Sequence, residues 1–396
     1  MSLSSISSIS SISILSSKNI NNLTEKIYLV GSGTISNTLS TTKIFGYSYD
    51  KNTWNVGEPR IFLATDEFIT DGTIIVAIGI ANGNNSFFTI GYSMDDGITW
   101  TGVGSSTNKT NTFLNWGSGI AYNPNFSSTS KKFVAVGRGN LNDSITASDD
   151  GITWSKAGIS DTIVSRGRGI TYGNGIFVVV GEGLLQMATS TDGINWNPIY
   201  TSTDNGFTWT INTNPNFFSD RGWSVDYNGS TAVVNDVNQV MFVAVGNGTI
   251  NDIATSHNGT HWIERGSIFL KSGSPQKSLG RSVKWSEYHK LWIAVGWNIP
   301  TTDNTPTILT SPDGINWTAR GQIILDGNTF NMLIDPISIA CKNEIIMIGG
   351  TRRIFEGTFT SSMIISTDVV NWDYVSGNLN DVTTSESVRA ILIKDI

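Results

Sequence analysis

Cysteine, histidine and charged side chains are all scarce in this sequence of 396 residues. The single cysteine, Cys341, excludes an internal disulfide framework and a zinc site built from cysteines. Three histidines are too few for a histidine-rich metal centre. Charged residues make up 14% of the chain and the net charge is −7, which argues against the basic stripe that neutralises phosphates in nucleic-acid-binding proteins. We therefore expect no metal, no cofactor and no nucleic acid among the ligands.

Long apolar runs are lacking as well. The segment 1–17 never places more than two apolar residues side by side, whereas a secretory signal needs about 7–15 contiguous ones and a membrane span about 18. Residues 1–25 form either a low-complexity tail or an extended anchor whose Ser and Ile side chains are buried on a partner. We expect this tail, a folded domain over 26–396, and neither a signal peptide nor a membrane span.

A short apolar run that ends in glycine recurs seven times along the chain. Successive copies, aligned on the first glycine, are 44 to 65 residues apart. Such runs, rich in Val and Ile, are typical of strands that are covered on both faces. The copies are KIYLVG (26–31), IIVAIG (74–79), KFVAVG (132–137), IFVVVG (176–181), MFVAVG (241–246), LWIAVG (291–296) and IIMIGG (345–350).

A second element, with Ser, Asp, Gly and Trp in fixed order, follows each run. Its Ser and Asp side chains can accept backbone N–H bonds within a turn, its Gly supplies a positive φ, and its Trp is predicted to pack between neighbouring repeats. The structural residues expected in these turns are Asp50, Asp95, Asp149, Asp192, Asp204, Asp313 and Asp368, with Trp54, Trp100, Trp154, Trp196, Trp209, Trp262, Trp317 and Trp372.

A third element precedes every run except the first, so that a complete repeat contains four short strands, as in a propeller blade. We place the first copy at RIFLATD (60–66). The chain begins without such a strand before 26–31 and ends with one, SVRAILIKDI (387–396). If strand 388–393 pairs with 26–31, the ring closes and no sheet edge is left exposed. The sequence therefore predicts an all-β, seven-bladed propeller of four-stranded blades.

The pattern Ser-x-Asp-x-Gly-x-Thr-Trp, complete at 93–100 and 202–209, resembles the Asp-box or BNR repeat. Propellers of this sialidase-like and sortilin-like superfamily include glycoside hydrolases, receptors, photosystem assembly factors, and structural or fibre proteins of phages and large DNA viruses. The chain is closest in style to the virion and phage structural propellers. In the family the box is a structural turn, so the resemblance implies the fold and not a sialidase activity.

Four arginines occupy comparable places near the start of predicted inner strands: Arg60, Arg168, Arg281 and Arg389. Because inner strands line the central channel, these side chains could form a cationic ring that holds an anion at one mouth. Alternatively, each arginine could bond to carbonyl groups of neighbouring blades. A sialidase-like site is not indicated, because the family's Arg-Ile-Pro segment is reduced to PRIF (59–62).

Other chemistry-bearing residues have simpler interpretations. Glu182 and Asp226 are lone carboxylates near the ends of inner strands, where they are usually solvated or paired. His257 and His261 are read as substitutions within one turn. Phe217 and Phe218 could form a contact patch or fold back on the extra hairpin. No catalytic residue is predicted.

The leading hypothesis is a non-catalytic structural or interaction propeller that is placed on a virion or extracellular surface. Its protein partners would contact the tail 1–24 and the loops 197–221, 265–280 and 350–361. The alternative is a glycan-binding lectin or sialidase-like glycoside hydrolase that uses the channel mouth. A third possibility is an assembly chaperone with a transient partner.

Overall fold

The structure is a computed structural model, and the residues that it describes fall into many short ranges. The tail 1–24, Arg60, Trp209 and Phe217 lie outside them, as do parts of the three predicted partner loops. The described residues are 25–32, 45–50, 53–58, 61–81, 87–104, 111–138, 144–157, 164–204, 207–208, 210–211, 218, 220–229, 240–248, 251–269, 278–298, 307–320, 322–325, 328–331, 333, 335–351, 354–355, 358–359, 362–375 and 387–395.

In these residues every regular element is a β-strand, and most strands fall into four-stranded antiparallel sets, which we call blades. Blade 1 comprises β4 (Ala64–Thr70), β5 (Ile75–Ile80), β6 (Ile90–Ser93) and β7 (Thr101–Gly102). Blade 2 comprises β8 (Trp116–Tyr122), β9 (Phe133–Arg138), β10 (Ile145–Ser148) and β11 (Trp154–Lys156). Blade 3 comprises β12 (Arg166–Gly173), β13 (Ile176–Glu182), β14 (Met187–Ser190) and β15 (Asn197–Pro198). Blade 4 comprises β18 (Arg221–Tyr227), β19 (Phe242–Gly248), β20 (Ile253–Ser256) and β21 (His261–Glu264).

The remaining blades follow the same order from the inner to the outer strand. Blade 5 comprises β22 (Ser278–Ser286), β23 (Leu291–Asn298), β24 (Ile308–Ser311) and β25 (Thr318–Arg320). Blade 6 comprises β28 (Asp335–Lys342), β29 (Ile345–Thr351), β32 (Met363–Ser366) and β33 (Asp373–Tyr374). Blade 7 comprises β34 (Ser387–Asp395), β1 (Glu25–Ser32), β2 (Phe45–Ser48) and β3 (Trp54–Val56). Three short hairpins or additions lie outside the blades: β16 (Tyr200–Ser202) with β17 (Thr210–Ile211), β26 (Gln322–Leu325) with β27 (Asn328–Asn331), and β30 (Ile354–Phe355) with β31 (Thr358–Phe359).

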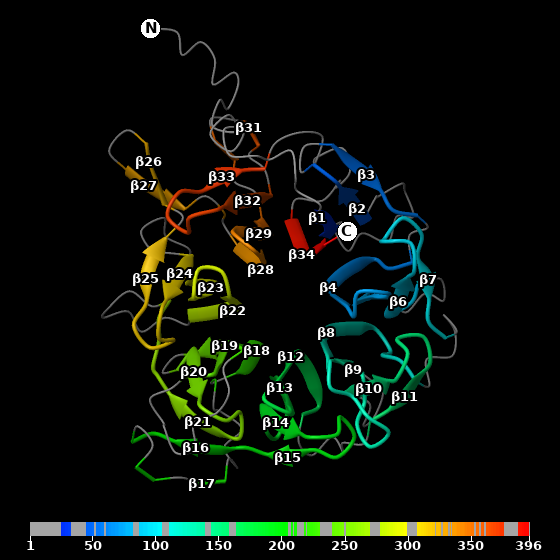
Figure 1. Cartoon of the computed structure of the whole chain (residues 1–396). Helices are drawn as coiled ribbons and strands as arrows, with labels where there is room; N and C mark the ends of the chain where they lie inside the picture. The colour runs from blue at the N-terminus through cyan, green and yellow to red at the C-terminus, as the bar shows by residue number, and fades with distance from the viewer. Residues whose placement is uncertain are drawn as a thin grey trace, which may run out of the picture.

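The blades stand in a circle with β4, β8, β12, β18, β22, β28 and β34 nearest the centre (Figure 1). The predicted closure is confirmed, because β34 pairs antiparallel with β1 from Lys26↔Lys394 to Gly31↔Val388. The two ends of the described chain therefore share one blade, and the protein is an all-β propeller. One strand boundary was wrong: the inner strand of blade 1 is 64–70, not 60–66. The error arose at Ile61 and Phe62, which are apolar and buried like residues of a strand but precede the strand.

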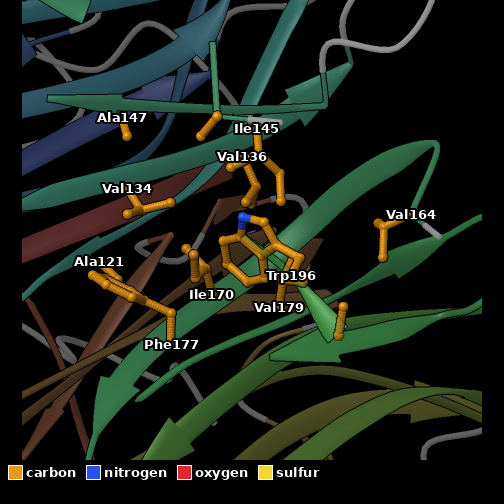
Figure 2. Packing of buried hydrophobic residues seen from close by; sticks show 12 residues of the cluster. Ala121, Val134, Val136, Ile145, Ala147, Val164, Ile170, Phe177, Val179 and Trp196 are labelled. Atoms are coloured by element: carbon orange, nitrogen blue, oxygen red, sulfur yellow. The ribbon is translucent and has the colours of Figure 1, made fainter. Parts of the chain in front are cut away.

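The core lies between the blades rather than at one centre. The buried apolar residues that the structure describes form seven clusters, and each cluster combines side chains of two neighbouring blades. Figure 2 shows one of them, in which Trp196 of blade 3 lies beside Val136 of blade 2. The predicted role of the tryptophan as the contact between repeats is confirmed there, and each blade is stabilised by the next.

The recurrent turn forms the predicted hydrogen bonds. In blade 3, Gly193 N donates to Ser190 Oγ at 2.8 Å, and Asn195 N donates to Asp192 Oδ1 at 2.7 Å. Gly193 has a φ of 74°, a conformation that side chains with a Cβ rarely adopt. The same acceptor role is filled by Asp50, Asp95, Asp204, Asp313 and Asp368, and by Asn258 in blade 4.

Blade 2 corrects the choice of Asp149. The turn acceptor is Asp150, whose Oδ1 accepts from Thr153 N at 2.6 Å and from Ser148 Oγ at 2.9 Å. Asp149 instead pairs with Lys131 at 2.8 Å. The spacing explains the error, because the acceptor stands two residues after the serine and Asp149 only one.

The tryptophans of the turns are buried except for Trp317, which is half-buried, and Trp209 lies outside the described residues. Buried indoles are those of Trp54, Trp100, Trp154, Trp196, Trp262 and Trp372.

The extra turn after blade 3 forms a hairpin that extends blade 4. Its strand β16 runs parallel to β21, with Tyr200 opposite His261, and the two rings stack with centroids 4.8 Å apart. His261 N donates to Asn258 Oδ1 at 2.9 Å, so the reading of this histidine as a turn substitution is confirmed. Phe218 is fully buried in the cluster between blades 3 and 4, and its role in an exposed contact patch is therefore excluded.

Candidate functional site

Each inner strand carries a β-bulge at the same height, and the bulge positions form a ring. The register of every inner strand with its neighbour skips one residue at this height. A bulge leaves a residue outside the ladder and redirects its side chain. In blade order the skipped residues are Asp66, Ser118, Arg168, Trp223, Arg281, Ile337 and Arg389.

The glycine that ends each repeated run makes room for this bulge. A Cβ added at Gly181 would lie 2.1 Å from the Arg166 carbonyl oxygen, and one at Gly137 would lie 2.2 Å from the Trp116 carbonyl oxygen. Those distances are far below contact range, so a side chain cannot be accommodated without moving the backbone. The repeated glycine is therefore a sequence signal of the bulge ring.

The bulge ring surrounds the mouth of one central cavity. The cavity has a volume of about 390 Å³, and all seven inner strands contribute to its wall. Every bulge residue is among those that line it. The fold thus places one side chain from each blade at a shared opening.

The ring contains three of the four predicted arginines, Arg168, Arg281 and Arg389. Arg60 lies outside the described residues. The position of blade 1 that corresponds to the three arginines is occupied by Asp66, which reverses the charge expected there. The ring is therefore not uniformly cationic.

Within the described part of the chain, the arginines of the ring pair with carboxylates rather than with the backbone carbonyls considered as an alternative. Arg389 Nη2 lies 2.7 Å from Asp66 Oδ1, and this pair joins blades 7 and 1. Arg281 Nη2 lies 3.7 Å from Asp335 Oδ2, which joins blades 5 and 6. Such partly buried pairs hold the side chains in place, although their net contribution to folding is small.

Trp223 separates two of these arginines. The guanidinium carbons of Arg168 and Arg281 each lie 4.3 Å from the centre of its ring system. Its Nε1 donates to Asn247 Oδ1 at 2.8 Å, which fixes the indole. Cation–π contacts on an anchored indole therefore set the spacing of the two positive charges.

Three guanidinium groups converge on a single oxygen of Glu182. Its Oε1 accepts from Arg168 Nε and Arg221 Nη1, both at 2.8 Å, and lies 3.8 Å from Arg166 Nη1. Burial lowers the pKa of Arg166 to about 10, and the neighbouring Arg168 and Arg138 add to this effect. Asp220 also pairs with Arg221, whose Nε lies 2.9 Å from its Oδ2, so two carboxylates face the three guanidinium groups and positive charge remains in excess at this side of the mouth.

A second charged cluster lies deeper in the cavity. Lys284 Nζ is 3.8 Å from Glu67 Oε1 and 3.7 Å from Asp226 Oδ1. Glu67 Oε2 accepts from Ile120 N at 3.0 Å, and Asp226 Oδ2 accepts from Trp285 N at 2.8 Å. The cluster therefore connects blades 1, 2, 4 and 5 across the cavity.

The deep cluster has unusual protonation properties. Burial raises the pKa of Glu67 to about 7, although Lys284 opposes this rise. Asp226 raises the pKa of Lys284, so the lysine stays charged. Burial also raises the pKa of Cys341 to about 12, and its thiol is therefore not a nucleophile at neutral pH.

Sequence reasoning missed Glu67 and Lys284. Glu182 and Asp226 were expected to be solvated or paired, and the structure shows that both are paired. The signal for Glu67 was its place directly after the bulge residue Asp66, but the misplaced inner strand of blade 1 concealed it. Among the described residues, no group of three or more His, Cys, Asp or Glu side chains is placed to hold a metal ion. No helix in the described ranges is long and apolar enough to cross a membrane.

Comparison with known proteins supports the fold alone. No protein-family model matches the sequence, and no curated protein matches it. A solved structure of a protein from Lactobacillus plantarum is similar over 93% of this chain and 99% of its own, with a TM-score of 0.56 and 7% identity. A candidate 6-phosphogluconolactonase from Bacteroides fragilis is similar over 94% and 98% of the two chains, with a TM-score of 0.52 and 10% identity.

A family 74 xyloglucanase from Xanthomonas campestris is similar over 78% of this chain, with a TM-score of 0.50 and 10% identity. The match spans 45% of the length of that enzyme. At identities this low the likeness shows a β-propeller and carries no activity with it.

Proposed function

We propose that this protein is a non-catalytic recognition propeller of the Asp-box type, which binds an anionic group of its partner at the mouth of the central cavity. The observation that carries the proposal is the ring of bulges, which directs Arg168, Arg281 and Arg389 from three separate blades to one opening. Guanidinium groups suit carboxylate, sulfate and phosphate oxygens because their N–H groups form a planar fork.

The rigidity of the mouth favours recognition. Arg168 and Arg281 are held by Trp223 and by carboxylates, and the side chain of Arg168 is only 10% exposed. A ligand would therefore meet groups that are already ordered, which reduces the entropy lost on binding. The crowding of Arg166, Arg168 and Arg221 around Glu182 supplies the surplus of positive charge that attracts an anion.

The recurrent turns support the Asp-box assignment. The serine hydroxyl accepts the glycine N–H and the aspartate accepts the following N–H groups in blade after blade. The turns lie where the third and fourth strands of a blade meet, away from the cavity, so they stabilise the blades and take no part in binding.

Binding of carboxylated or sulfated glycans and of inorganic sulfate tests this function. We expect Arg168→Ala and Arg281→Ala to weaken binding by tenfold or more, since each removes a charged group from the mouth. Arg320→Ala is the matched control, because Arg320 ends the outer strand β25 and bonds to Thr310 Oγ1 at 3.2 Å. An absence of binding to every anion, or equal binding by all variants, would contradict the proposal.

We propose further that residues 1–24 attach the propeller to a larger assembly, such as a virion surface. Support comes from the Ser/Ile pattern and the Asp-box resemblance, and these residues lie outside the described part of the chain. Deletion of 1–24 should leave the circular dichroism of the propeller unchanged and abolish its incorporation into the assembly. Normal incorporation of the shortened protein would contradict this role.

A glycoside hydrolase is the second candidate function, and Glu67 favours it. A carboxyl group whose burial raises its pKa to about 7 can act as a general acid, and Asp226 supplies a second carboxylate on the other side of Lys284. A panel of fluorogenic glycosides tests this candidate. Hydrolysis that is lost in Glu67→Gln and in Asp226→Asn would establish it and exclude a purely non-catalytic role.

A further inference from the structure

We propose that anion binding at the arginine mouth is coupled to protonation of Glu67, so that the ligand binds more tightly as the pH falls. This inference rests on the proposed recognition function and concerns how the same site is regulated. It follows from the position of one carboxyl group relative to the bulge ring and the deep cluster.

Glu67 connects the two charged layers of the cavity. It directly follows Asp66, the ring residue that pairs with Arg389 at 2.7 Å. Its own Oε1 lies 3.8 Å from Lys284 Nζ, and its Oε2 accepts from Ile120 N at 3.0 Å. All of these residues line the same cavity. A charge placed at the mouth therefore acts on Glu67 through the cavity rather than through bulk solvent.

The charged groups around Glu67 come from several strands. Its own strand β4 contributes Asp66, β22 contributes Lys284, β18 contributes Asp226 and β34 contributes Arg389. Strand β5, which pairs with β4, carries no titratable side chain, and the titratable side chain of β8 is the phenol of Tyr122.

These surroundings decide the protonation of the carboxyl group. Burial raises the pKa of Glu67 to about 7, Lys284 lowers it, and Asp226 and Asp66 raise it further. The group thus changes its charge near neutral pH. Lys284 stays protonated, because Asp226 raises its pKa, and burial raises the pKa of the Cys341 thiol to about 12.

The sign of the coupling follows from electrostatics. An anion at the mouth adds negative charge near Glu67 and competes with Asp66 for the guanidinium group of Arg389. Both changes raise the pKa of Glu67, so binding of the anion takes up a proton. By thermodynamic reciprocity, a protonated Glu67 increases the affinity for the anion by the same factor. A unit charge about 10 Å from Glu67, in a medium of effective dielectric constant about 20, changes the affinity for the anion on the order of tenfold.

Calorimetric titration with sodium sulfate tests the coupling. Sulfate keeps its charge between pH 5.5 and 8.5, and sodium chloride keeps the ionic strength constant. Titrations in two buffers of different ionisation enthalpy give the number of protons taken up. The variants are Glu67→Gln and, as a control, Glu287→Gln, whose carboxylate is 69% exposed in a turn.

We expect the wild-type protein and Glu287→Gln to bind sulfate about tenfold more tightly at pH 5.5 than at pH 8.5, with uptake of protons near pH 7. Glu67→Gln should bind with one affinity at every pH, close to that of the wild-type protein at pH 5.5. A wild-type affinity that is independent of pH, or a pH dependence that persists in Glu67→Gln, would overturn the coupling and leave the proposed function intact. If sulfate binds at no pH, the proposed function fails together with the coupling. If Glu67→Gln does not fold, carboxyl NMR of the wild-type protein decides, since sulfate must raise the pKa of Glu67.

Discussion

Replacement of Trp262 by alanine should destabilise the protein more than the same replacement of Trp317. Trp262 is 0% exposed, and it packs against Val178 and Val180 of the preceding blade. Its Nε1 also donates to Gly259 O at 2.7 Å. A buried tryptophan that is truncated to alanine costs about 3–5 kcal/mol, because apolar contacts are lost and a cavity remains.

Trp317 provides a matched comparison, because it holds the same place in the turn of blade 5. Its Nε1 donates to Gly314 O at 3.2 Å, but the indole is only half-buried. With less area removed from water, we expect Trp317→Ala to cost roughly 1.5–3 kcal/mol.

Urea unfolding followed by far-ultraviolet circular dichroism measures both losses. The free energy of unfolding should fall by at least about 1 kcal/mol more for Trp262→Ala than for Trp317→Ala. Equal losses, or a loss below about 1 kcal/mol for Trp262→Ala, would refute the view that a buried indole between two blades stabilises their contact.

Three further predictions concern charged residues. First, burial raises the pKa of Glu67 to about 7 from 4.5, so the stability that this group contributes is fully present below pH 4.5 and is lost as the pH rises to about 7. The free energy of unfolding of Glu67→Gln, measured by urea unfolding at each pH, should therefore increase by about 1–3 kcal/mol relative to that of the wild-type protein between pH 4.5 and 8. A difference between the two proteins that does not change with pH would contradict the burial of Glu67. Second, Asp150→Ala should lower the free energy of unfolding by about 1–2 kcal/mol because the turn loses the acceptor of Thr153 N, whereas Asp149→Ala should lower it by less than about 0.5 kcal/mol. If thermal unfolding showed the larger loss for Asp149→Ala, Asp149 would be the turn residue after all. Third, Arg389→Ala should lower the free energy of unfolding by about 1–3 kcal/mol, because it leaves the largely buried Asp66 without its ion-pair partner. The double variant that also carries Asp66→Asn should recover part of that loss.

Much of the fold was predictable because its signals are local. Each repeat carries its own apolar run, its own turn residues and its own tryptophan, so the strands and turns follow from short segments read one at a time. The closure of the ring was also predictable, since the chain supplies at its end the inner strand that it lacks at its start, and β34 indeed pairs with β1. The two errors arose where a local pattern was displaced along the chain: the predicted strand 60–66 lies four residues before the observed strand 64–70, and Asp149 lies one residue before the turn acceptor Asp150.

The candidate site was predictable only in part. Arg168, Arg281 and Arg389 were found from their common place in the repeat, because the sequence period and the bulge ring have the same origin. Their partners were not found. Glu182 is the last residue of β13 and Asp335 is the first residue of β28, and each lies on a different strand from the arginine that it binds.

The sequence by itself determined the architecture, because strands, turns and interblade tryptophans are each specified within a segment of a few residues. A row of such repeats either closes into a ring or leaves a sheet edge exposed. Only the tertiary structure decided the chemistry of the cavity. Glu67 and Lys284 lie on strands that are far apart in the chain and meet because the ring brings opposite blades within reach of one another. The charge of such a group depends on burial and on neighbours from other blades, and those are properties of the closed ring rather than of any segment in it.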